Sequence, residues 1–303
     1  MGGVFRGLGL VWATACMGLA AGPQPPIRVL ILDGFSNHDW AHTTALIGEV
    51  LGPTGRFQVE VATCPTRPDD PGLAAFSPRL SGHDVVLVNC NSLGNGGQWP
   101  LTVRDDFVRF VGGGGGAFIF HSANNSFAGW LEYDRIIGLG WRGPKDGVAL
   151  AIGADESIQR IAPGDGKGTS HGPRGDRLVH RLGDHPIHAG LPRTWMAAMI
   201  EVYTFARGPA ERLEVLSWAE DPVTATRWPI EWTVRYGKGR VYNSTFGHVW
   251  RGETDPPGLR CAGFQTILVR ALQWLANRPV DDAVPADFPG VAQPSLRRMP
   301  ARQ

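Results

Sequence analysis

The chain has 303 residues, of which 43% are hydrophobic and 19% are charged, so it can bury the core of one large domain or of two small ones. Its 29 basic and 28 acidic residues give a formal net charge of +1. Without long runs of either sign, this balance argues against a nucleic-acid partner and against bulk attraction of an acidic substrate.

The first 22 residues resemble a secretory signal peptide. Arg6 supplies positive charge, residues 8–20 form an apolar stretch, and Leu19-Ala20-Ala21 offers small residues for cleavage. A stable membrane span is not favoured, because the stretch is short and prolines follow it at once. Cys16 lacks the preceding large aliphatic residue of a lipoprotein site, which makes a lipid anchor the lesser alternative. We therefore expect an exported protein, either periplasmic or secreted.

The first half of the chain alternates between strands and helices. Apolar residues at helical spacing predict helices over 40–51 and 103–111, and the glycine run 112–116 stops the second of them and allows close packing. Buried apolar runs or simple alternation predict four strands, over 27–32, 57–61, 84–90 and 117–120. This order is typical of βαβ units in a mostly parallel sheet.

The second half is less regular. Residues 140–195 are rich in Gly, Pro, Arg and His, which predicts long loops with one strand at 147–152. Residues 264–275 follow helical spacing, whereas the Pro-rich, polar segment 279–303 predicts a loosely ordered tail. Further strands are predicted over 199–205, 213–218, 232–236 and 240–246.

Polar side chains follow three of the predicted parallel strands, at the point where each strand ends. Ligands of open α/β sheets bind outside the carboxyl ends of such strands, so these side chains favour a common site. The first strand brings Asp33, Asn37, His38, Asp39 and His42, the third brings Asn89 and Asn91, and the fourth brings His121, Ser122, Asn124 and Asn125.

The histidines are the chemically informative members of this group. A neutral imidazole at His121, directly after a buried strand, can act as a base, an acid or a metal ligand at ordinary pH. His38 opens a predicted helix, where an exposed loop histidine is the alternative interpretation. His42 follows it by four residues, a spacing that can chelate a metal but here lacks the HExxH frame. His248 follows a strand in the same arrangement as His121.

Glu201 and His171 extend the list from the second half of the chain. Glu201 lies between apolar neighbours in a predicted strand and is either a paired structural carboxylate or a catalytic one. His171 lies in a predicted loop. Five histidines in candidate loops make a divalent metal ion a candidate cofactor, although no recognised ligand spacing identifies the ligands.

Two nucleophile interpretations find little support in the local sequence. Ser122 lacks small residues two positions to either side, so a hydrogen-bonding role is favoured over a nucleophile elbow. Cys90 ends a buried strand, which favours a structural cysteine over a reactive thiol. Removal of the first 22 residues would leave three cysteines without CxxC spacing, which define neither a disulfide framework nor a zinc site.

Five short motifs follow one another over about residues 27–277. They are Asn37-His38-Asp39-Trp40, Gly114-Gly115-Gly116 through His121-Ser122, Asp184-His185-Pro186-Ile187 with Gly190-Leu191-Pro192, Glu201-Val202-Tyr203, and Tyr236-Gly237-Lys238-Gly239-Arg240-Val241 through Gly247-His248. In this order and spacing the chain resembles the trehalose-utilisation (ThuA-like) family, on the fold of class I glutamine amidotransferases.

The resemblance implies a single flavodoxin-like α/β domain, with a mostly parallel sheet, helices on both faces and an elaborated C-terminal half. It also implies that His121 occupies the region where amidotransferases carry their nucleophilic cysteine. No Cys-His-Glu set stands there, so glutamine hydrolysis is not expected. The family is associated with uptake or breakdown of disaccharides, often alongside oxidoreductases that form 3-keto sugars. Tryptophans in the loops suit a sugar ligand, namely Trp40, Trp99, Trp130, Trp141 and Trp250.

The leading hypothesis is an exported sugar-processing enzyme, a hydrolase or lyase acting on a glycoside or 3-keto-glycoside. Its chemistry would be histidine and carboxylate acid–base catalysis or metal-assisted catalysis. The alternatives are a non-catalytic carbohydrate-binding or accessory protein of disaccharide utilisation, and a glutamine-dependent amidotransferase using Cys90. The candidate catalytic residues are His38, His121, Glu201 and His248, and the candidate substrate-binding residues are Asp33, Asn37, Trp40, Asn91, Ser122, Asn124, Trp141 and His171.

Overall fold

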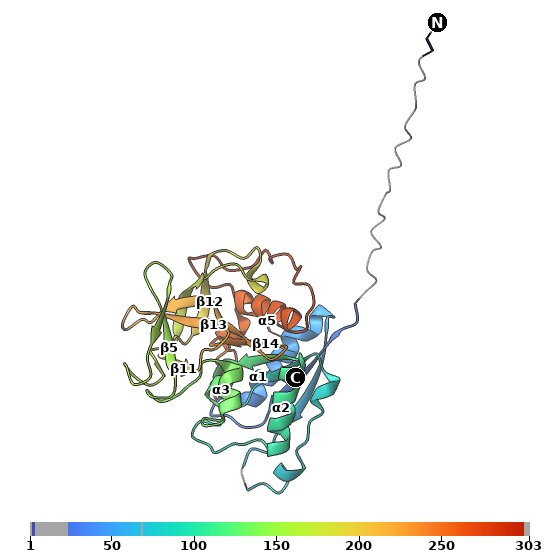
Figure 1. Cartoon of the computed structure of the whole chain (residues 1–303), viewed down its shortest axis with the longest axis vertical. Helices are drawn as coiled ribbons and strands as arrows, with labels where there is room; N and C mark the ends of the chain where they lie inside the picture. The colour runs from blue at the N-terminus through green and yellow to red at the C-terminus, as the bar shows by residue number, and fades with distance from the viewer. Residues whose placement is uncertain (1, 4–23, 68, 300–303) are drawn as a thin grey trace.

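A central sheet organises the protein, and the computed structural model describes residues 2–3, 24–67 and 69–299 (Figure 1). The strands along its main path are β1 (Ile27–Asp33), β2 (Phe57–Thr63), β3 (Val85–Val88), β4 (Gly116–Phe120), β8 (Gly175–Arg181), β9 (Thr194–Ile200), β12 (Leu213–Glu220), β13 (Arg227–Tyr236) and β14 (Gly239–Ser244). Their order is β2-β1-β3-β4-β14-β13-β12-β8-β9. Neighbours from β2 to β14 run parallel, and neighbours from β14 to β9 run antiparallel.

Shorter strands and the helices complete the described structure. The short strands are β5 (Val148–Ile152), β6 (Ile158–Ile161) and β11 (Arg207–Gly208), which join the main sheet, and β7 (Ser170–His171) and β10 (Tyr203–Thr204), which pair with each other. The α-helices are α1 (Trp40–Leu51), α2 (Leu101–Gly113), α3 (Leu131–Ile137), α4 (Pro257–Arg260) and α5 (Ala262–Leu275). The 3-10 helices are η1 (Gly52–Thr54), η2 (Leu73–Ala75), η3 (Leu80–Gly82), η4 (His121–Asn125) and η5 (Pro186–His188).

Helices cover both faces of the parallel strands and create two hydrophobic cores. On one face, Ile31 of β1 belongs to the same buried cluster as Leu46 of α1 and residues of α5. On the other face, Leu32 of β1 joins a cluster with Phe107 of α2 and residues of α3. Successive strand residues point to opposite faces, and both faces of β3 and β4 are buried, so these two strands are apolar throughout, whereas the edge strand β2 alternates. The predicted α/β class with helices on both faces is confirmed.

The glycine run 112–116 connects α2 to β4 and packs closely against the end of α5. Gly114 adopts φ 123° just after the helix, a conformation that side chains with a Cβ rarely reach. An added Cβ at Gly116 would lie 2.7 Å from the carbonyl oxygen of Leu275, because the end of α5 packs on this strand. Both predicted roles of the run, helix termination and close packing, are therefore confirmed.

The second half of the chain departs from the predictions in several places. Residues 140–195 contain β6, β7, β8 and the start of β9 in addition to the one expected strand. These strands escaped sequence analysis because β6 is largely exposed and β8 fully buries only Val179, so neither has a clear apolar pattern. The strand predicted over 199–205 is instead the end of β9 and all of β10. Glu201 lies in the break between them.

The C-terminal segment also differs from its prediction. Residues 279–299 contain no helix and no long strand, yet backbone bonds join Met196 to Gly290 and Ala262 to Ser295, each at 2.8 Å. Arg270 of α5 donates to the carbonyl oxygen of Asp282 at 2.6 Å. The prediction of a loose tail is therefore wrong for this range, because buried donors of the domain bind its backbone carbonyls. Such pairing leaves no hydrophobic periodicity in the sequence.

The predicted signal peptide, residues 1–22, lies outside the described residues apart from positions 2 and 3. Among the helices of the described residues, none combines the length and the hydropathy needed to cross a bilayer.

A buried polar cluster ties the antiparallel strands to η5. Glu231 of β13 is fully buried and accepts hydrogen bonds from Tyr242 at 2.6 Å and from Ser217, and it lies 3.3 Å from Nε2 of His188. Burial by itself would raise the pKa of Glu231. The neighbouring His188 and the hydrogen bonds outweigh this effect, and the pKa lies below its usual value.

The first prediction concerns packing at Gly116. Gly116→Ala should lower the free energy of unfolding by about 1–3 kcal/mol, because the new methyl group must displace the end of α5. The matched control is Gly113→Ala, since nothing lies within 4 Å of a Cβ there and alanine favours the helix. Urea unfolding of both variants measures the difference. Equal stability of the two variants would contradict the packing account.

The second prediction concerns pH and Glu231. Its folded-state pKa is depressed, so the stability it contributes is present above the unfolded value near 4.5 and is lost as the pH falls toward the folded value. Glu231→Gln should lower the free energy of unfolding by about 3 kcal/mol at neutral pH. The difference in the free energy of unfolding between wild type and variant should become smaller below pH 4.5. Denaturant unfolding across this range measures that difference. A difference independent of pH would contradict the lowered pKa of Glu231.

Candidate functional site

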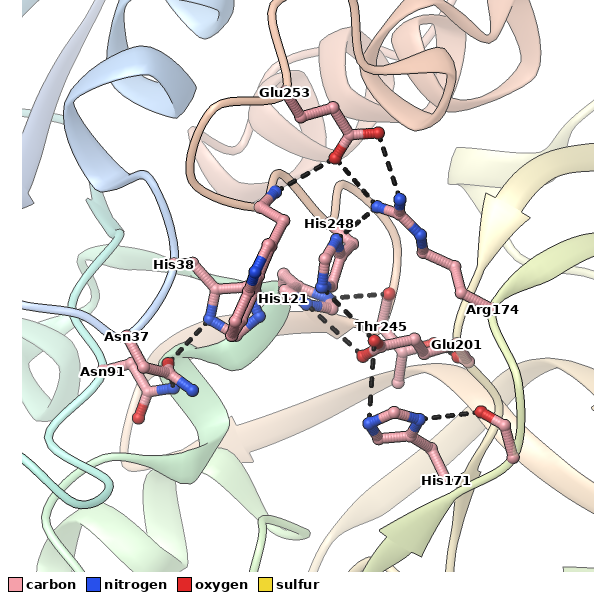
Figure 2. Close-up of polar contacts among 12 residues, drawn as sticks. Asn37, His38, Asn91, His121, His171, Arg174, Glu201, Thr245, His248 and Glu253 are labelled. Carbon is pink, nitrogen blue, oxygen red and sulfur yellow. Dashed lines mark hydrogen bonds and ion pairs between the residues drawn. The ribbon is translucent and has the colours of Figure 1, made fainter.

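Three histidines meet at the carboxyl edge of the parallel strands (Figure 2). His38 lies between β1 and α1, His121 begins η4 directly after β4, and His248 follows β14. One ring nitrogen from each lies within 4.8 Å of the other two. The structure thus brings together three of the four candidate catalytic residues, because β1, β4 and β14 all point the same way.

Glu201 completes this group from the break between β9 and β10. Its carboxylate is buried, and Oε2 lies 3.7 Å from Nε2 of His121. The other oxygen, Oε1, lies 3.3 Å from Nε2 of His248 and 3.6 Å from Nε2 of His171. Figure 2 shows the carboxylate between these rings. Burial raises the pKa of Glu201, although His171 and Arg174 act in the opposite direction.

The three clustered imidazoles are neutral at ordinary pH. Burial lowers the pKa of His38 to about 3, and repulsion that a charged His38 would meet from the neighbouring His248, His171 and Arg174 acts in the same direction. Burial and Arg174 lower the pKa of His248 to about 4, and burial with the two neighbouring rings holds the pKa of His121 well below its usual value. None of these three rings therefore supplies a positive charge to balance the carboxylate of Glu201.

Hydrogen bonds fix which ring nitrogen carries the proton. Nδ1 of His121 lies 2.9 Å from the carbonyl oxygen of Thr245, and Nδ1 of His38 lies 2.8 Å from Oδ1 of Asn37. Asn91 donates to the same Asn37 oxygen at 2.7 Å and so orients its amide group. Carbonyl oxygens only accept, so both Nδ1 atoms donate and both Nε2 atoms present lone pairs to the site.

His248 is held in the opposite form by a residue that the sequence analysis did not select. Nη1 of Arg174 lies 2.5 Å from Nδ1 of His248, and Arg174 also makes two bonds to Glu253, at 2.9 and 3.1 Å. A guanidinium only donates, so Nδ1 of His248 accepts and its Nε2 carries the proton toward Glu201. Arg174 and Glu253 lie in irregular segments, and no motif or periodicity in the sequence marks them.

Aromatic side chains flank the histidines on two sides. Trp250 is 49% exposed and stacks on His248 with ring centroids 5.8 Å apart. Trp141 packs edge-on against Tyr203 at 5.3 Å and lies 5.7 Å from His171. Trp141 and Trp250 therefore lie beside the histidines, and their contact with a sugar stays a prediction.

Two of the other tryptophans were wrongly expected to face a ligand. Trp99 is 2% exposed and packs against Phe127 at 4.8 Å, inside the core beneath α2. Trp130 stacks on Tyr133 at 5.4 Å in the same core. Their loops form part of a hydrophobic cluster, so their rings serve packing.

The remaining candidate residues have supporting contacts. Asp33 accepts a hydrogen bond from Thr44 of α1 at 2.7 Å, and burial raises its pKa. The carbonyl oxygen of Trp40 accepts from Asn89 at 3.0 Å. These contacts hold α1 against the sheet, and the backbone N–H of Trp40 also donates to the carbonyl oxygen of His38 at 3.0 Å.

Ser122 and Asn124 are buried in η4 beside His121. The amide group of Asn124 has no hydrogen-bond partner among the described residues. The structure does not test whether either side chain contacts a substrate, and a binding role for them stays a prediction.

Two alternatives from the sequence are not supported by the geometry. His42 is buried within α1, which begins at Trp40, so His38 and His42 do not share a helix face. Cys90 is 1% exposed, its thiol contacts the carbonyl oxygen of Leu32 at 3.3 Å, and burial raises its pKa well above the usual value. Such a thiol is a poor nucleophile, which argues against amidotransferase chemistry at Cys90.

Comparisons with solved structures include a close match in fold. A solved structure described as a ThuA-like protein from Parabacteroides merdae shares 30% sequence identity with a TM-score of 0.83, covering 90% of this chain and 98% of that chain. A glutamine amidotransferase from Thermotoga maritima shares 9% identity over 74% of this chain and 76% of that chain, with a TM-score of 0.40. At that value the second likeness says nothing about what this chain does.

The family comparison agrees with the strong match. No curated protein matches the chain. The sequence profile of the ThuA family, described as trehalose utilisation, matches residues 28–275. This range includes all four candidate catalytic residues and most of the chain. The protein therefore belongs to the ThuA family of trehalose-utilisation proteins.

Proposed function

We propose that this protein is an enzyme that acts on a glycoside or a 3-keto-glycoside at the site formed by His38, His121, Glu201 and His248. The observation that carries the proposal is the buried carboxylate of Glu201, which lies 3.3 to 3.7 Å from imidazole nitrogens, two of them on the neutral rings of His121 and His248. Membership of a trehalose-utilisation family supports a sugar as the ligand.

The proposed reaction of a 3-keto-glycoside begins at the carbon between the ketone and the anomeric centre. Glu201 removes the proton from this carbon, and the electron pair moves into the ketone to form an enolate. The pair then returns to expel the glycosidic oxygen, which takes the proton back from Glu201. This elimination cleaves the glycosidic bond and leaves an unsaturated keto sugar and a free alcohol, so that one carboxyl group serves as base and then as acid.

The neutral rings have separate roles in this scheme. The N–H on Nε2 of His248 faces the carboxylate at 3.3 Å and can donate to the oxygen on which negative charge develops. Arg174 fixes the proton on that nitrogen. Nε2 of His38 and Nε2 of His121 accept hydrogen bonds from sugar hydroxyl groups. A neutral imidazole suits the donor role because it stabilises an oxyanion without becoming an acid strong enough to protonate it.

The aromatic side chains on either side of the histidines suit a sugar ring. Trp250 is half-exposed and Trp141 is partly exposed, so each offers an apolar face to the C–H groups of a pyranose. Export also belongs to this proposal, since Arg6 and the apolar stretch 8–20 form the pattern of a signal peptide.

The third prediction tests the role of Glu201. Glu201→Gln should lower the turnover of a 3-keto-disaccharide by about 10²–10⁴-fold, because the amide cannot accept the proton, while the sugar still binds. Chromatography of the products measures turnover, and calorimetry measures binding. Glu211→Gln is the matched control, since Glu211 is exposed.

Two outcomes would overturn this proposal. Full activity of the Glu201→Gln variant would exclude Glu201 as the base. Binding of disaccharides and their keto forms to the wild-type protein without any product would instead support a non-catalytic carbohydrate-binding protein.

A further inference from the structure

We propose that Nε2 of His38, Nε2 of His121 and Nε2 of His248 form a binding site for one divalent transition-metal ion. The inference concerns ion binding by the protein alone, so it does not depend on a sugar substrate. When the ion is bound, these three nitrogens are its ligands, and the roles given to them above in holding the sugar and the developing oxyanion pass to the ion. The inference is tested without measuring turnover.

The spacing of the three rings fits a common ion. One nitrogen from each histidine lies within 4.8 Å of the others, and all three rings pack edge-on, with centroids 4.8 to 5.2 Å apart. Imidazole nitrogens bind such ions at about 2.1 Å, which places two ligands about 3 to 4 Å from each other. Small rotations of the side chains therefore bring the three nitrogens into ligand positions.

His121 provides an independent indication that something binds here. Its side chain is 2% exposed, and Nε2 is buried without a hydrogen-bond partner among the described residues. A buried polar atom left without a partner costs free energy, which a ligand would recover. His121 also adopts φ 44°, a left-handed conformation that a residue with a Cβ takes up only where the surrounding structure enforces it. Figure 2 shows its ring grouped with those of His38 and His248.

His38 and His121 each make a hydrogen bond through Nδ1 that is typical of metal-binding histidines. Metal-binding histidines commonly donate their second ring N–H to a carbonyl or carboxylate oxygen, which orients the ring and raises its basicity. Nδ1 of His121 does so to Thr245, and Nδ1 of His38 does so to Asn37, which Asn91 holds in place. Both Nε2 atoms therefore carry the lone pair that an ion requires.

His248 needs one rearrangement to become the third ligand. Arg174 donates to its Nδ1, so the ring proton now occupies Nε2, on the side of the ion. Ion binding moves that proton from Nε2 to Nδ1, and Arg174 then keeps only its two bonds to Glu253. Because the contact with Arg174 opposes this change, Arg174 weakens the site. Removing its guanidinium should strengthen ion binding.

The ligand set narrows the choice of ion. Three imidazoles favour Zn²⁺, Co²⁺ or Ni²⁺ over Mg²⁺ and Ca²⁺, which prefer oxygen ligands. Three protein ligands also leave an open position for water or a substrate oxygen, as in catalytic zinc sites. Glu201, 3.7 Å from Nε2 of His121, lies beside the ligand atoms and can accept a proton from a molecule bound there.

The fourth prediction tests the ion site with the full chain after treatment with a chelator. Calorimetry with Zn²⁺, and elemental analysis after dialysis, should give one ion per chain. His38→Ala should weaken binding more than 100-fold, and His121→Ala should do the same. His38 is only half-buried, so its variant is the less disruptive, and circular dichroism verifies folding. Asn37→Ala should lose about 10–100-fold in affinity, as expected of a residue that orients a ligand.

Three further variants test whether the ion binds to the three assigned histidines and not to neighbouring residues. His171→Ala is the matched control, because this ring also contacts Glu201 but lies outside the group of three, and it should retain the ion. Arg174→Met should bind Zn²⁺ more tightly than wild type. Glu201→Gln should lose turnover yet still bind one ion, which distinguishes failure of the ion site from failure of the proposed reaction.

Several results would overturn the inference. Absence of a stoichiometric ion in the wild-type protein would do so, as would unchanged affinity in both His38→Ala and His121→Ala. Loss of the ion in His171→Ala would show that the assigned ligand set is wrong. Weaker binding in Arg174→Met would contradict the proposed exchange of protons on His248.

Discussion

Parallel pairing of β4 with β14 is the constraint on which the rest of the site depends. The register that aligns Phe120 with Ser244 places the residues that follow these strands, His121 and Thr245, at the same edge of the sheet. The carbonyl oxygen of Thr245 then lies 2.9 Å from Nδ1 of His121 and fixes that ring. His248 follows three residues after Thr245. The same backbone pairing thus brings together two imidazoles from distant parts of the sequence and orients one of them.

The charges around the site leave Glu201 without a cationic partner among the three clustered histidines. The guanidinium of Arg174 lies nearby, but its two hydrogen bonds to Glu253 pair its charge with that carboxylate. Burial keeps the pKa of His38 and of His248 low, so these rings do not supply positive charge at neutral pH. A carboxylate held among neutral nitrogens in a buried place is well suited to take up a proton or to share a cation.

The sequence predicted the parts of this arrangement that depend on the sheet. His38, His121 and His248 all follow parallel strands, and apolar runs reveal such strands without knowledge of the fold. Glu201 was selected as an acid among apolar neighbours, although it lies in a break between strands. Trp99 was misjudged because a loop tryptophan can pack inward as readily as face a ligand.

Other features could not be predicted because they depend on contacts between irregular segments. Arg174 and Glu253 lie in loops without periodicity, and their pairing across the fold has no counterpart in local sequence. The order of 279–299 likewise rests on hydrogen bonds to backbone carbonyls, such as that of Asp282, which every residue type carries. Composition alone therefore suggested disorder.

The backbone of His121 has a consequence for how this site can change over time. A left-handed conformation costs a residue with a Cβ about 1–3 kcal/mol, a cost that glycine would not carry. Substitution of His121 by glycine would relieve this backbone strain, but it would also remove the imidazole from the centre of the pocket. Selection for thermal stability alone would therefore favour loss of the histidine, and its retention in related proteins would indicate that the pocket has a function.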